Sequence, residues 1–157
     1  MLLYFVRHGE AEPARGKTDE ERELTAAGLA QVQRAAGVIQ RMAVQVEVVY
    51  CSPRARAQQT AAQLAQALGK QVEVSRALDF DFGPSAVTDF VHAHSTADLM
   101  FVGHEPTMSN TLETITGARV IMRPGSIACV ELTSRATLRG ELVWFGSPGL
   151  MDALAGS

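Results

Sequence analysis

The sequence predicts an α/β fold: a three-layer sandwich with a mostly parallel central sheet, helices flanking the sheet and a C-terminal β-hairpin. Short unbroken apolar runs, typical of strands buried on both faces, begin at residues 2 and 99. Segments with apolar residues at helical spacing lie between such runs, which favours βαβ units. Polar clusters follow three of the expected strands, where ligands of open α/β sheets bind.

The length of 157 residues is typical of one domain, so we expect a single domain over residues 1–157. The net charge of −3 argues against generic nucleic-acid binding. No apolar run approaches the ~18–20 residues of a membrane span, and no basic segment precedes the apolar start, as a signal peptide requires. The two cysteines, Cys51 and Cys129, lie in apolar stretches, where we expect buried small hydrophobes. This cysteine usage suits the cytoplasm.

The first part of the chain alternates strand and helix signals. Residues 2–6 (Leu-Leu-Tyr-Phe-Val) predict a strand, and the polar residues 10–23, with a proline and a glycine, predict a surface loop. Thr25 is a typical cap for the helix that follows, in which apolar residues recur at helical spacing as far as Ile39. The β-branched residues 44–50 predict the second strand.

The next helix signal is a serine followed by a proline. Ser52 can cap a helix and Pro53 suits its first position, so we expect the helix to begin there and to end at Gly69. Residues 72–74 predict a short strand. A loop at residues 76–87 follows, rich in aspartate, glycine and proline.

The last part of the chain predicts two helices, a buried strand and a hairpin. A short helix is expected from residue 88 to about 94, and the apolar residues 99–102 predict a strand. A helix follows over about 106–116 and ends at a glycine. The closing hairpin is expected at residues 127–132 and 142–145.

The polar clusters that follow the strands are the main functional signal. They are Arg7 to Glu10, Ser52 to Arg56, and Gly103 to Pro106. Arg56 lies in the first turn of a helix, where free N–H groups and the helix dipole favour an anion. Arginine forks match phosphate oxygens, so two arginines and two histidines would meet around one tetrahedral dianion. A histidine kept neutral by those arginines can attack phosphorus and form a phosphohistidine, which water hydrolyses without a metal.

These clusters resemble a known family. Arg7-His8-Gly9 is similar to the RHG signature of the histidine phosphatase (phosphoglycerate mutase-like) superfamily. Residues 24–28 (Leu-Thr-Ala-Ala-Gly), residues 52–60 and Val102-Gly103-His104 follow in the order of the family's motifs, so the match covers nearly the whole chain. The resemblance implies a nucleophile, His8, and a phosphate pocket of Arg7, Arg56 and His104.

Within the superfamily, three features resemble the SixA-type phosphohistidine phosphatases. They are the short length, Arg22 just before the motif at residues 24–28, and the Gly-His-Glu-Pro sequence at residues 103–106. Mutases of the superfamily usually carry His-Gly at the second histidine and an Asn a few residues after RHG. Here Glu105 follows that histidine and residues 11–16 contain no Asn, which counts against mutase activity.

We therefore expect a metal-independent phosphatase, without a cofactor, that hydrolyses phosphohistidine on a protein. The substrate would be a signalling or histidine phosphotransfer-type protein, and the reaction would pass through a covalent phosphohistidine at His8. Two alternatives stay open: the same mechanism on a small phosphorylated metabolite, and a phosphate-binding domain without catalysis. No nucleic-acid or membrane partner is expected.

The sequence also offers candidates for the general acid and two further arginines. Many relatives carry a Glu on the loop after the third strand, where this chain has Asp79 and Asp81, and we rank Asp79 first. Arg22 lies in a run of charged residues and is either a phosphate contact or a solvated loop residue. Arg54 is expected to be exposed.

Two further pairs of residues lie near these motifs or mimic a site. Glu10 and Glu105 flank the histidines and either orient them or only sit at helix starts. His92 and His94 are two residues apart and would face different directions on a helix, so we expect surface histidines and not a metal pair.

Overall fold

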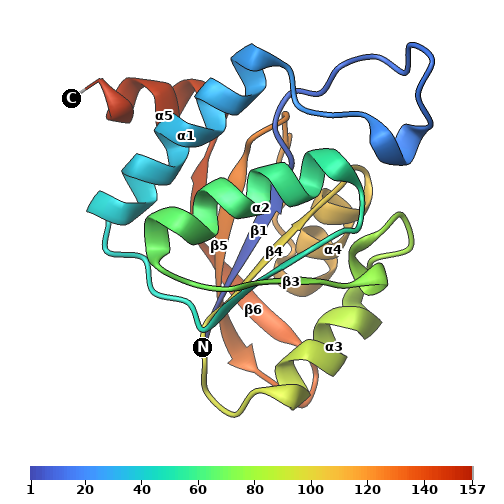
Figure 1. Cartoon of the computed structure of the whole chain (residues 1–157). Coiled ribbons are helices and arrows are strands. Elements are labelled where there is room, and N and C mark those ends of the chain that lie inside the picture. The colour runs from blue at the N-terminus through green and yellow to red at the C-terminus, as the bar shows by residue number, and fades with distance from the viewer. Residues whose placement is uncertain (157) are drawn as a thin grey trace.

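The computed structural model describes residues 1–156 and contains one six-stranded mixed sheet (Figure 1). The strands are β1 (Leu2–Arg7), β2 (Val48–Cys51), β3 (Val72–Val74), β4 (Leu99–Gly103), β5 (Ile127–Ser134) and β6 (Arg139–Gly146). Their order across the sheet is β3-β2-β4-β1-β5-β6. The four strands from β3 to β1 are parallel, and β5 and β6 add antiparallel strands at the β1 side. The predicted α/β sandwich with its closing hairpin is confirmed.

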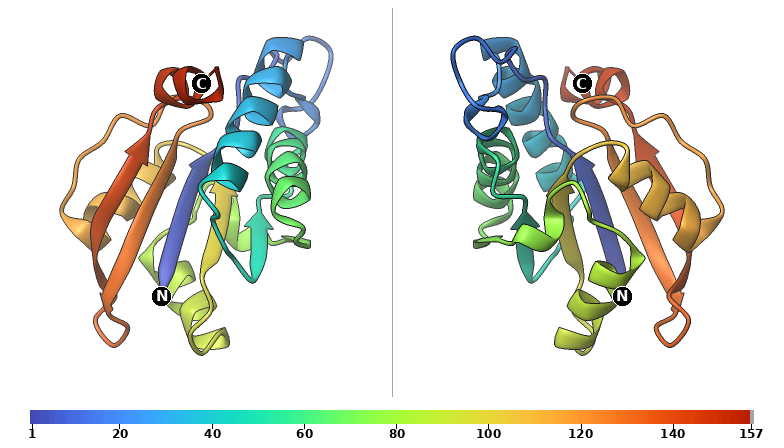
Figure 2. Two further views of the ribbon diagram at one scale, coloured as in Figure 1. Left: turned by 90° about the vertical axis from the view of Figure 1, so that its left-hand side faces the viewer. Right: turned by 90° about the vertical axis from the view of Figure 1, so that its right-hand side faces the viewer.

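Helices cover both faces of the sheet (Figure 2). The α-helices are α1 (Ala26–Arg41), α2 (Ala55–Leu68), α3 (Pro84–Ala93), α4 (Thr107–Thr116) and α5 (Pro148–Ala155), with short 3₁₀ helices η1 (Asp19–Glu21) and η2 (Arg76–Leu78). Helices α1, α2 and α5 pack on one face, and α3 and α4 pack on the other. Within residues 1–156, no helix has the length and apolar character needed to cross a bilayer.

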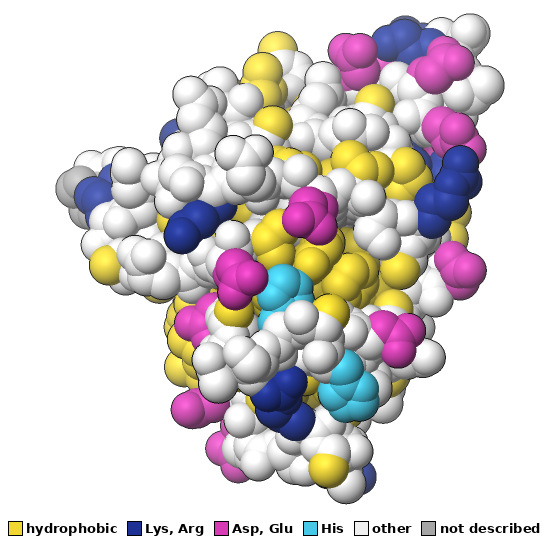
Figure 3. Space-filling model, turned by 60° about the horizontal axis from the view of Figure 1, so that its bottom comes forward, with side chains coloured by type: hydrophobic (Ala, Val, Ile, Leu, Met, Phe, Trp, Pro, Cys, Tyr) yellow, Lys and Arg dark blue, Asp and Glu magenta, His cyan; other side chains and the backbone are white. Residues whose placement is uncertain are grey.

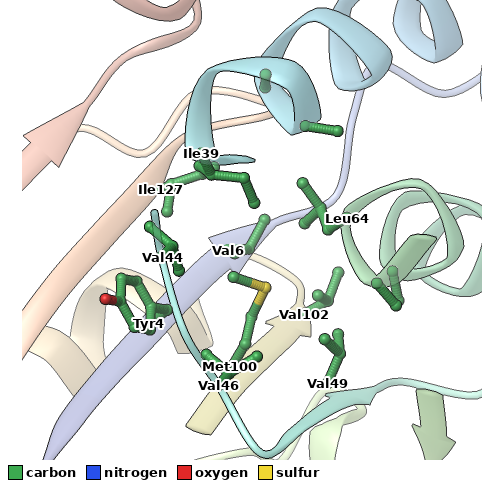
Figure 4. Packing of buried hydrophobic residues seen from close by; sticks show 14 of the residues in the cluster. Tyr4, Val6, Ile39, Val44, Val46, Val49, Leu64, Met100, Val102 and Ile127 are labelled. Carbon is green, nitrogen blue, oxygen red and sulfur yellow. The ribbon is translucent and has the colours of Figure 1, made fainter. Parts of the chain in front are cut away.

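Two hydrophobic clusters, one on each face, hold the layers together. Successive residues of β1 alternate between them: Tyr4 contributes to the cluster under α1 and α2, and Phe5 to the cluster under α3 and α4. Figure 4 shows the first cluster, where Ile39 of α1 and Leu64 of α2 lie over the side chains of Val6 and its neighbours on the sheet. A strand covered on both faces must be apolar throughout, which explains the unbroken run at residues 2–6.

Several element boundaries differ from the sequence prediction: both hairpin strands are longer than expected, and three elements begin at other residues. Strand β2 begins at Val48, because residues 44–47 are a connection whose valines are buried outside the sheet. Helix α2 begins at Ala55, since Ser52 is engaged with the second histidine and does not cap the helix. Helix α3 begins at Pro84 and not near residue 88. The Gly-Pro pair that suggested a loop supplies the N-cap and the first helical position of α3.

The sequence prediction missed helix α5 altogether. Its cap is Ser147, whose hydroxyl accepts a hydrogen bond from the backbone N–H of Leu150 at 3.2 Å, and Pro148 follows at the first helical position. Met151 of this helix is buried in the cluster that it shares with α1 and α2. A serine–proline pair therefore precedes both α2 and α5. Only the pair Ser147-Pro148 starts its helix at the proline.

Helix α1 contacts the loop after β1 through a glycine, and this contact predicts a large effect of a small substitution. A Cβ on Gly28 would lie 2.2 Å from the carbonyl oxygen of Glu10, so Gly28→Ala must move the backbone. We expect the free energy of unfolding, measured with urea, to fall by roughly 1–3 kcal/mol or more. Gly37→Ala is the matched control in the same helix, since its nearest atom lies 3.9 Å away. It should be neutral or stabilise by up to about 1 kcal/mol, and equal losses in both variants would contradict the prediction.

Candidate active site

The carboxyl ends of β1, β2 and β4 bring the three polar clusters to one edge of the sheet. Backbone hydrogen bonds continue just past the strands: the N–H of His8 donates to the Gly103 carbonyl at 3.0 Å, and that of Ser52 donates to the Val102 carbonyl at 3.0 Å. Two loops border this edge, and we name them the first rim loop (residues 10–23) and the second rim loop (residues 79–83). The first rim loop is the dark blue segment at the upper right of Figure 1.

The two histidines lie side by side at this edge. The ring centroids of His8 and His104 are 5.1 Å apart in an edge-to-face arrangement. Both residues are buried, with exposed fractions of 9% and 1%. The Nε2 atom of His104 lies 2.7 Å from Ser52 Oγ. Two imidazoles therefore face one small region at the ends of neighbouring strands.

The hydrogen bonds of His8 define its tautomer. Its Nδ1 lies 2.7 Å from the Gly9 carbonyl oxygen, and Arg56 Nε donates to its Nε2 at 3.3 Å. Because a carbonyl oxygen only accepts and a guanidinium only donates, Nδ1 carries the proton and Nε2 carries the lone pair. His8 is thus a neutral imidazole, and the lone pair on its Nε2 faces Arg56.

Burial lowers the pKa of both histidines. For His8, burial is the largest cause and brings the pKa to about 4. The hydrogen bond to Gly9 opposes this change, and the charges of Arg56, Arg7 and Arg22 add to it. The pKa of His104 falls to about 3, again mainly through burial, with smaller contributions from His8 and Arg56. The sequence predicted the effect of the arginines, but desolvation is the stronger cause.

These shifts predict that the protein loses stability as the pH falls from 7 to 5. In the unfolded chain both histidines have a pKa near ~6.5, so below that pH the unfolded state binds more protons than the folded state. The free energy of unfolding, measured with urea, should fall by roughly 2 kcal/mol for each histidine by pH 5. His8→Asn should remove about half of this dependence, whereas His92→Asn, at an exposed position, should leave it unchanged. A flat profile in the parent protein would contradict the burial of neutral histidines.

Hydrogen bonds to other protein groups hold the two arginines of the predicted phosphate pocket in place. Arg56 donates from Nη1 to the Asp19 carbonyl at 2.7 Å and from Nη2 to Asp19 Oδ2 at 3.1 Å. Its Nε is left directed at His8. Arg7 donates from Nη1 to the Met122 carbonyl at 2.9 Å. Each guanidinium is therefore anchored at one end.

Three buried polar atoms have no hydrogen-bond partner among the described residues. They are Arg7 Nε, His104 Nδ1 and Ser126 Oγ. Ser126 is next to Arg7, since its carbonyl accepts the Arg7 backbone N–H at 3.1 Å. An unsatisfied buried polar group costs roughly 1–3 kcal/mol. An oxyanion at this edge would offer acceptors to the unpaired guanidinium nitrogen, as the predicted phosphate pocket requires.

The structure separates the two candidate acids. Asp79 lies at the site, with Oδ1 at 3.8 Å from His104 Nε2. Asp81 is exposed and lines a surface depression with Ser85 and Asp89. Arg22 binds its own loop: Nε donates to the Glu12 carbonyl at 2.7 Å, and Nη1 donates to a carboxylate oxygen of Asp19 at 2.8 Å.

The prediction for Arg54 was wrong, because only 12% of its side chain is exposed. Its guanidinium pairs with Asp19 at 2.6 Å and with Asp79 at 2.7 Å. Asp19 was not predicted at all. Hydrogen bonding from Arg22 is the largest cause that lowers the pKa of Asp19 to about 2. Nothing in the sequence distinguishes this aspartate from the other acidic residues of its loop.

Thr60 is a further residue that the sequence reasoning did not single out. Its Oγ1 accepts the N–H of Gly9 at 3.1 Å and donates to the Arg56 carbonyl at 2.8 Å. The threonine that closes the motif at residues 52–60 therefore ties the end of β1 to the first turn of α2.

The glutamates next to the histidines, Glu10 and Glu105, bond to residues at helix starts and not to the histidines. Glu105 accepts hydrogen bonds from the N–H and the hydroxyl of Ser109, in the first turn of α4. Glu10 accepts a hydrogen bond from the hydroxyl of Thr25, the cap of α1. Both carboxylates therefore lie at helix starts.

The remaining motif residues lie away from the site. The prediction that His94 is a surface histidine was wrong, because this residue is half-buried. Its Nε2 lies 2.7 Å from Tyr50 Oη, and its Nδ1 lies 3.2 Å from a carboxylate oxygen of Glu47. This group is near the amino ends of the parallel strands. Figure 3 shows that side of the molecule, where acidic and basic side chains are scattered around exposed apolar surface. Both cysteines are buried and free, as predicted.

Comparison with known proteins adds three findings. The sequence model of the histidine phosphatase superfamily (branch 1) matches residues 3–86. An uncharacterised protein from Picosynechococcus sp. is 34% identical over 120 residues, which cover 73% of each chain. The solved structure of the protein histidine phosphatase SixA complexed with tungstate has a TM-score of 0.85 at 24% identity, covering 95% of this chain and 98% of that chain.

A metabolite phosphatase is also similar in fold. The solved phosphoserine phosphatase from Entamoeba histolytica, in complex with phosphoserine, has a TM-score of 0.72 at 16% identity, covering 94% of this chain and 97% of that chain. The shared fold therefore includes proteins named for both kinds of substrate.

Proposed function

Because the chain belongs to the histidine phosphatase superfamily (branch 1), we propose that it hydrolyses phosphohistidine on a protein through a covalent intermediate at His8. One observation carries this proposal: His8 is neutral, and its Nε2 lone pair faces the Arg56 guanidinium beside a second buried histidine. This arrangement offers a nucleophile and positive charge to the same phosphoryl group.

In the first step, His8 Nε2 attacks the phosphorus and forms a new P–N bond. The P–N bond of the substrate breaks, and the leaving imidazole nitrogen keeps the electron pair; with its other ring nitrogen protonated beforehand by solvent, the imidazole leaves as a neutral ring. Arg7, Arg56 and His104 donate hydrogen bonds to the transferring oxygens, where negative charge is concentrated. The hydrogen bond from Nδ1 to the Gly9 carbonyl keeps the ring oriented and stabilises the positive charge that develops on it.

In the second step, water attacks the phosphorus of the phosphorylated His8. The P–N bond breaks, orthophosphate leaves, and the electron pair returns to Nε2. The same three donors stabilise this transition state, because the charge on the phosphoryl oxygens is again the main change. The mechanism uses protein groups and water and needs no metal.

A protein substrate is favoured over a metabolite for two reasons. The rim loops are short for a chain that must enclose a small molecule in a deep cavity. The fold is also more similar to that of the protein histidine phosphatase SixA than to that of the phosphoserine phosphatase, with TM-scores of 0.85 and 0.72.

A substrate panel tests the proposal. It compares a phosphohistidine-bearing phosphotransfer protein with phosphoserine, sugar phosphates and nucleotide phosphates, all assayed with EDTA present. We expect kcat/KM to be highest for the phosphohistidine protein, by about two orders of magnitude or more. A preference for a metabolite by the same margin would assign the alternative substrate class. Phosphate binding without turnover of any substrate would indicate a binding domain.

The position of Asp79 predicts how its loss depends on the leaving group. Asp79→Asn should lower kcat for esters with poor leaving groups by roughly 10²-fold or more, because such groups need a proton as they depart. Phosphohistidine should lose far less, since its imidazole can arrive protonated on the other ring nitrogen and then leaves as a neutral ring. Asp81→Asn is the matched control on the same loop and should leave both rates unchanged. Equal losses on the two substrates in Asp79→Asn would mean that this carboxylate does not deliver the proton.

A further inference from the structure

Arg54 uses all three of its guanidinium nitrogens on carboxylates from the two rim loops. Nη1 donates to Asp19 Oδ2 of the first rim loop at 2.6 Å. Nε and Nη2 donate to the two carboxylate oxygens of Asp79, on the second rim loop, at 2.7 and 3.3 Å. Arg54 itself is the N-cap residue of α2. One side chain at a fixed helix start therefore joins both loops that border the site.

The Asp19 contact connects Arg54 to the phosphate pocket. Asp19 Oδ2 accepts from Arg54 and also from Arg56 Nη2, and the Asp19 carbonyl accepts from Arg56 Nη1. These bonds use both Nη atoms of Arg56, while its Nε donates to Nε2 of His8. Because the Asp19 side chain is 42% exposed, it needs partners to hold it in this position. Arg54 supplies the shortest of its hydrogen bonds.

The Asp79 contact connects Arg54 to the second histidine. Both oxygens of Asp79 face the Arg54 fork, and Oδ1 then lies 3.8 Å from His104 Nε2. The ring of Phe80 contacts both Arg54 and His104: the Arg54 guanidinium carbon is 4.1 Å from the ring centroid, and the centroid of the His104 ring is 4.8 Å from it. The planar guanidinium suits a bidentate carboxylate and an aromatic face at once, which a lysine cannot reproduce.

We propose that Arg54 is a positioning residue: through Asp19 it aligns Arg56 with His8, and through Asp79 it places a carboxylate beside His104. This inference rests on the proposed function, because it assigns His8 and Arg56 to phosphoryl transfer. Arg54 acts without touching the phosphoryl group. Its loss should therefore misalign the site while the strands that carry the histidines stay in place.

Arg54→Gln tests the proposal, with Arg34→Gln as the matched control. Arg34 also pairs with an aspartate, Asp152, at 2.9 Å, but on the outer helices α1 and α5. We expect Arg54→Gln to lower kcat/KM roughly 10–100-fold, the size of effect that small misplacements of a site produce. Arg34→Gln should remain within about twofold of the parent. A loss in Arg54→Gln no larger than that of the control would overturn the proposal.

Double-variant cycles separate positioning from a general loss of structure. Asp19→Asn removes the carboxylate that Arg54 binds on the first rim loop, and Asp79→Asn removes the one that it binds on the second. If Arg54 acts through these carboxylates, combining either change with Arg54→Gln should cost less than the sum of the single effects. Additive losses would overturn the proposal. Guanidinium ion at low concentration should restore part of the activity of Arg54→Ala, whereas methylammonium should not.

Two measurements keep the test decisive if activity is absent or folding fails. Binding of inorganic phosphate, measured by calorimetry, should weaken about tenfold in Arg54→Gln and remain unchanged in Arg34→Gln. A parent protein without turnover would refute the proposed function, and phosphate binding would still decide the role of Arg54.

If Arg54→Gln does not fold, Arg54→Lys is the second variant, because it keeps the positive charge without the two-pronged guanidinium. It should show the same weakened binding, and parent-like binding in that variant would overturn the proposal.

Discussion

His8→Ala is expected to lower kcat/KM on phosphohistidine by at least about 10⁴-fold, since nucleophile losses in enzymes that form covalent intermediates are of this size. The substitution removes Nε2, the atom that we propose receives the phosphoryl group. Its effect should therefore appear in kcat and not only in KM. The measurement is steady-state hydrolysis of a phosphohistidine protein, with each variant checked for folding by circular dichroism.

Trapping of the intermediate supplies the direct test of this role. Labelled phosphoramidate should leave an acid-labile, base-stable label on the parent protein and none on His8→Ala. His92→Ala is the matched control, because that histidine is exposed on α3 and lies outside the site. It should retain both the label and full activity. A label that persists in His8→Ala would move the nucleophile to another histidine.

Arg56→Ala should have the second largest effect, a loss of roughly 10²–10³-fold in kcat/KM, typical of removing one donor that stabilises transition-state charge. Arg56 is 3% exposed, and its Nε donates to His8 Nε2, the proposed nucleophile. Arg56→Lys should recover little of this loss, because a single ammonium cannot reproduce the fork that matches phosphate oxygens. Kinetics on the phosphohistidine protein and phosphate binding by calorimetry measure the two parts of the effect.

The control for Arg56→Ala is Arg34→Ala, which removes an arginine from α1 at a surface ion pair. It should leave kcat/KM unchanged. A loss in Arg56→Ala that appears only as a higher KM would mean that the guanidinium binds the ground state and the transition state equally. That result would remove Arg56 from the chemical step.

The sequence predicted the placement of the histidines because a general rule determines it. The carboxyl ends of parallel strands share one edge, so residues that follow such strands meet there. The apolar runs before His8 and His104 identified those strands, and the family resemblance supplied the order of the motifs. The same rule does not place Asp19 or Arg54, whose positions depend on how two loops fold against the start of α2.

The paired serine–proline signals illustrate why local patterns alone are insufficient. Pro148 is the first residue of α5 and Ser147 caps it, whereas Arg54 separates Ser52-Pro53 from the start of α2 at Ala55. The difference lies in the tertiary partner: the Ser52 hydroxyl is 2.7 Å from His104, a residue far away in the sequence. The low histidine pKa values have a similar origin, because burial is a property of the folded chain and not of neighbouring residues.

The central position of β1 has a consequence for how the protein is made. β1 pairs with β4 on one side and with β5 on the other, so Leu3 finds its neighbours only at Leu99 and Val130. Because β1 precedes both of these partner strands in the chain, its pairing must close long loops, which slows folding and leaves the two edges of β1 unpaired until β4 and β5 are available.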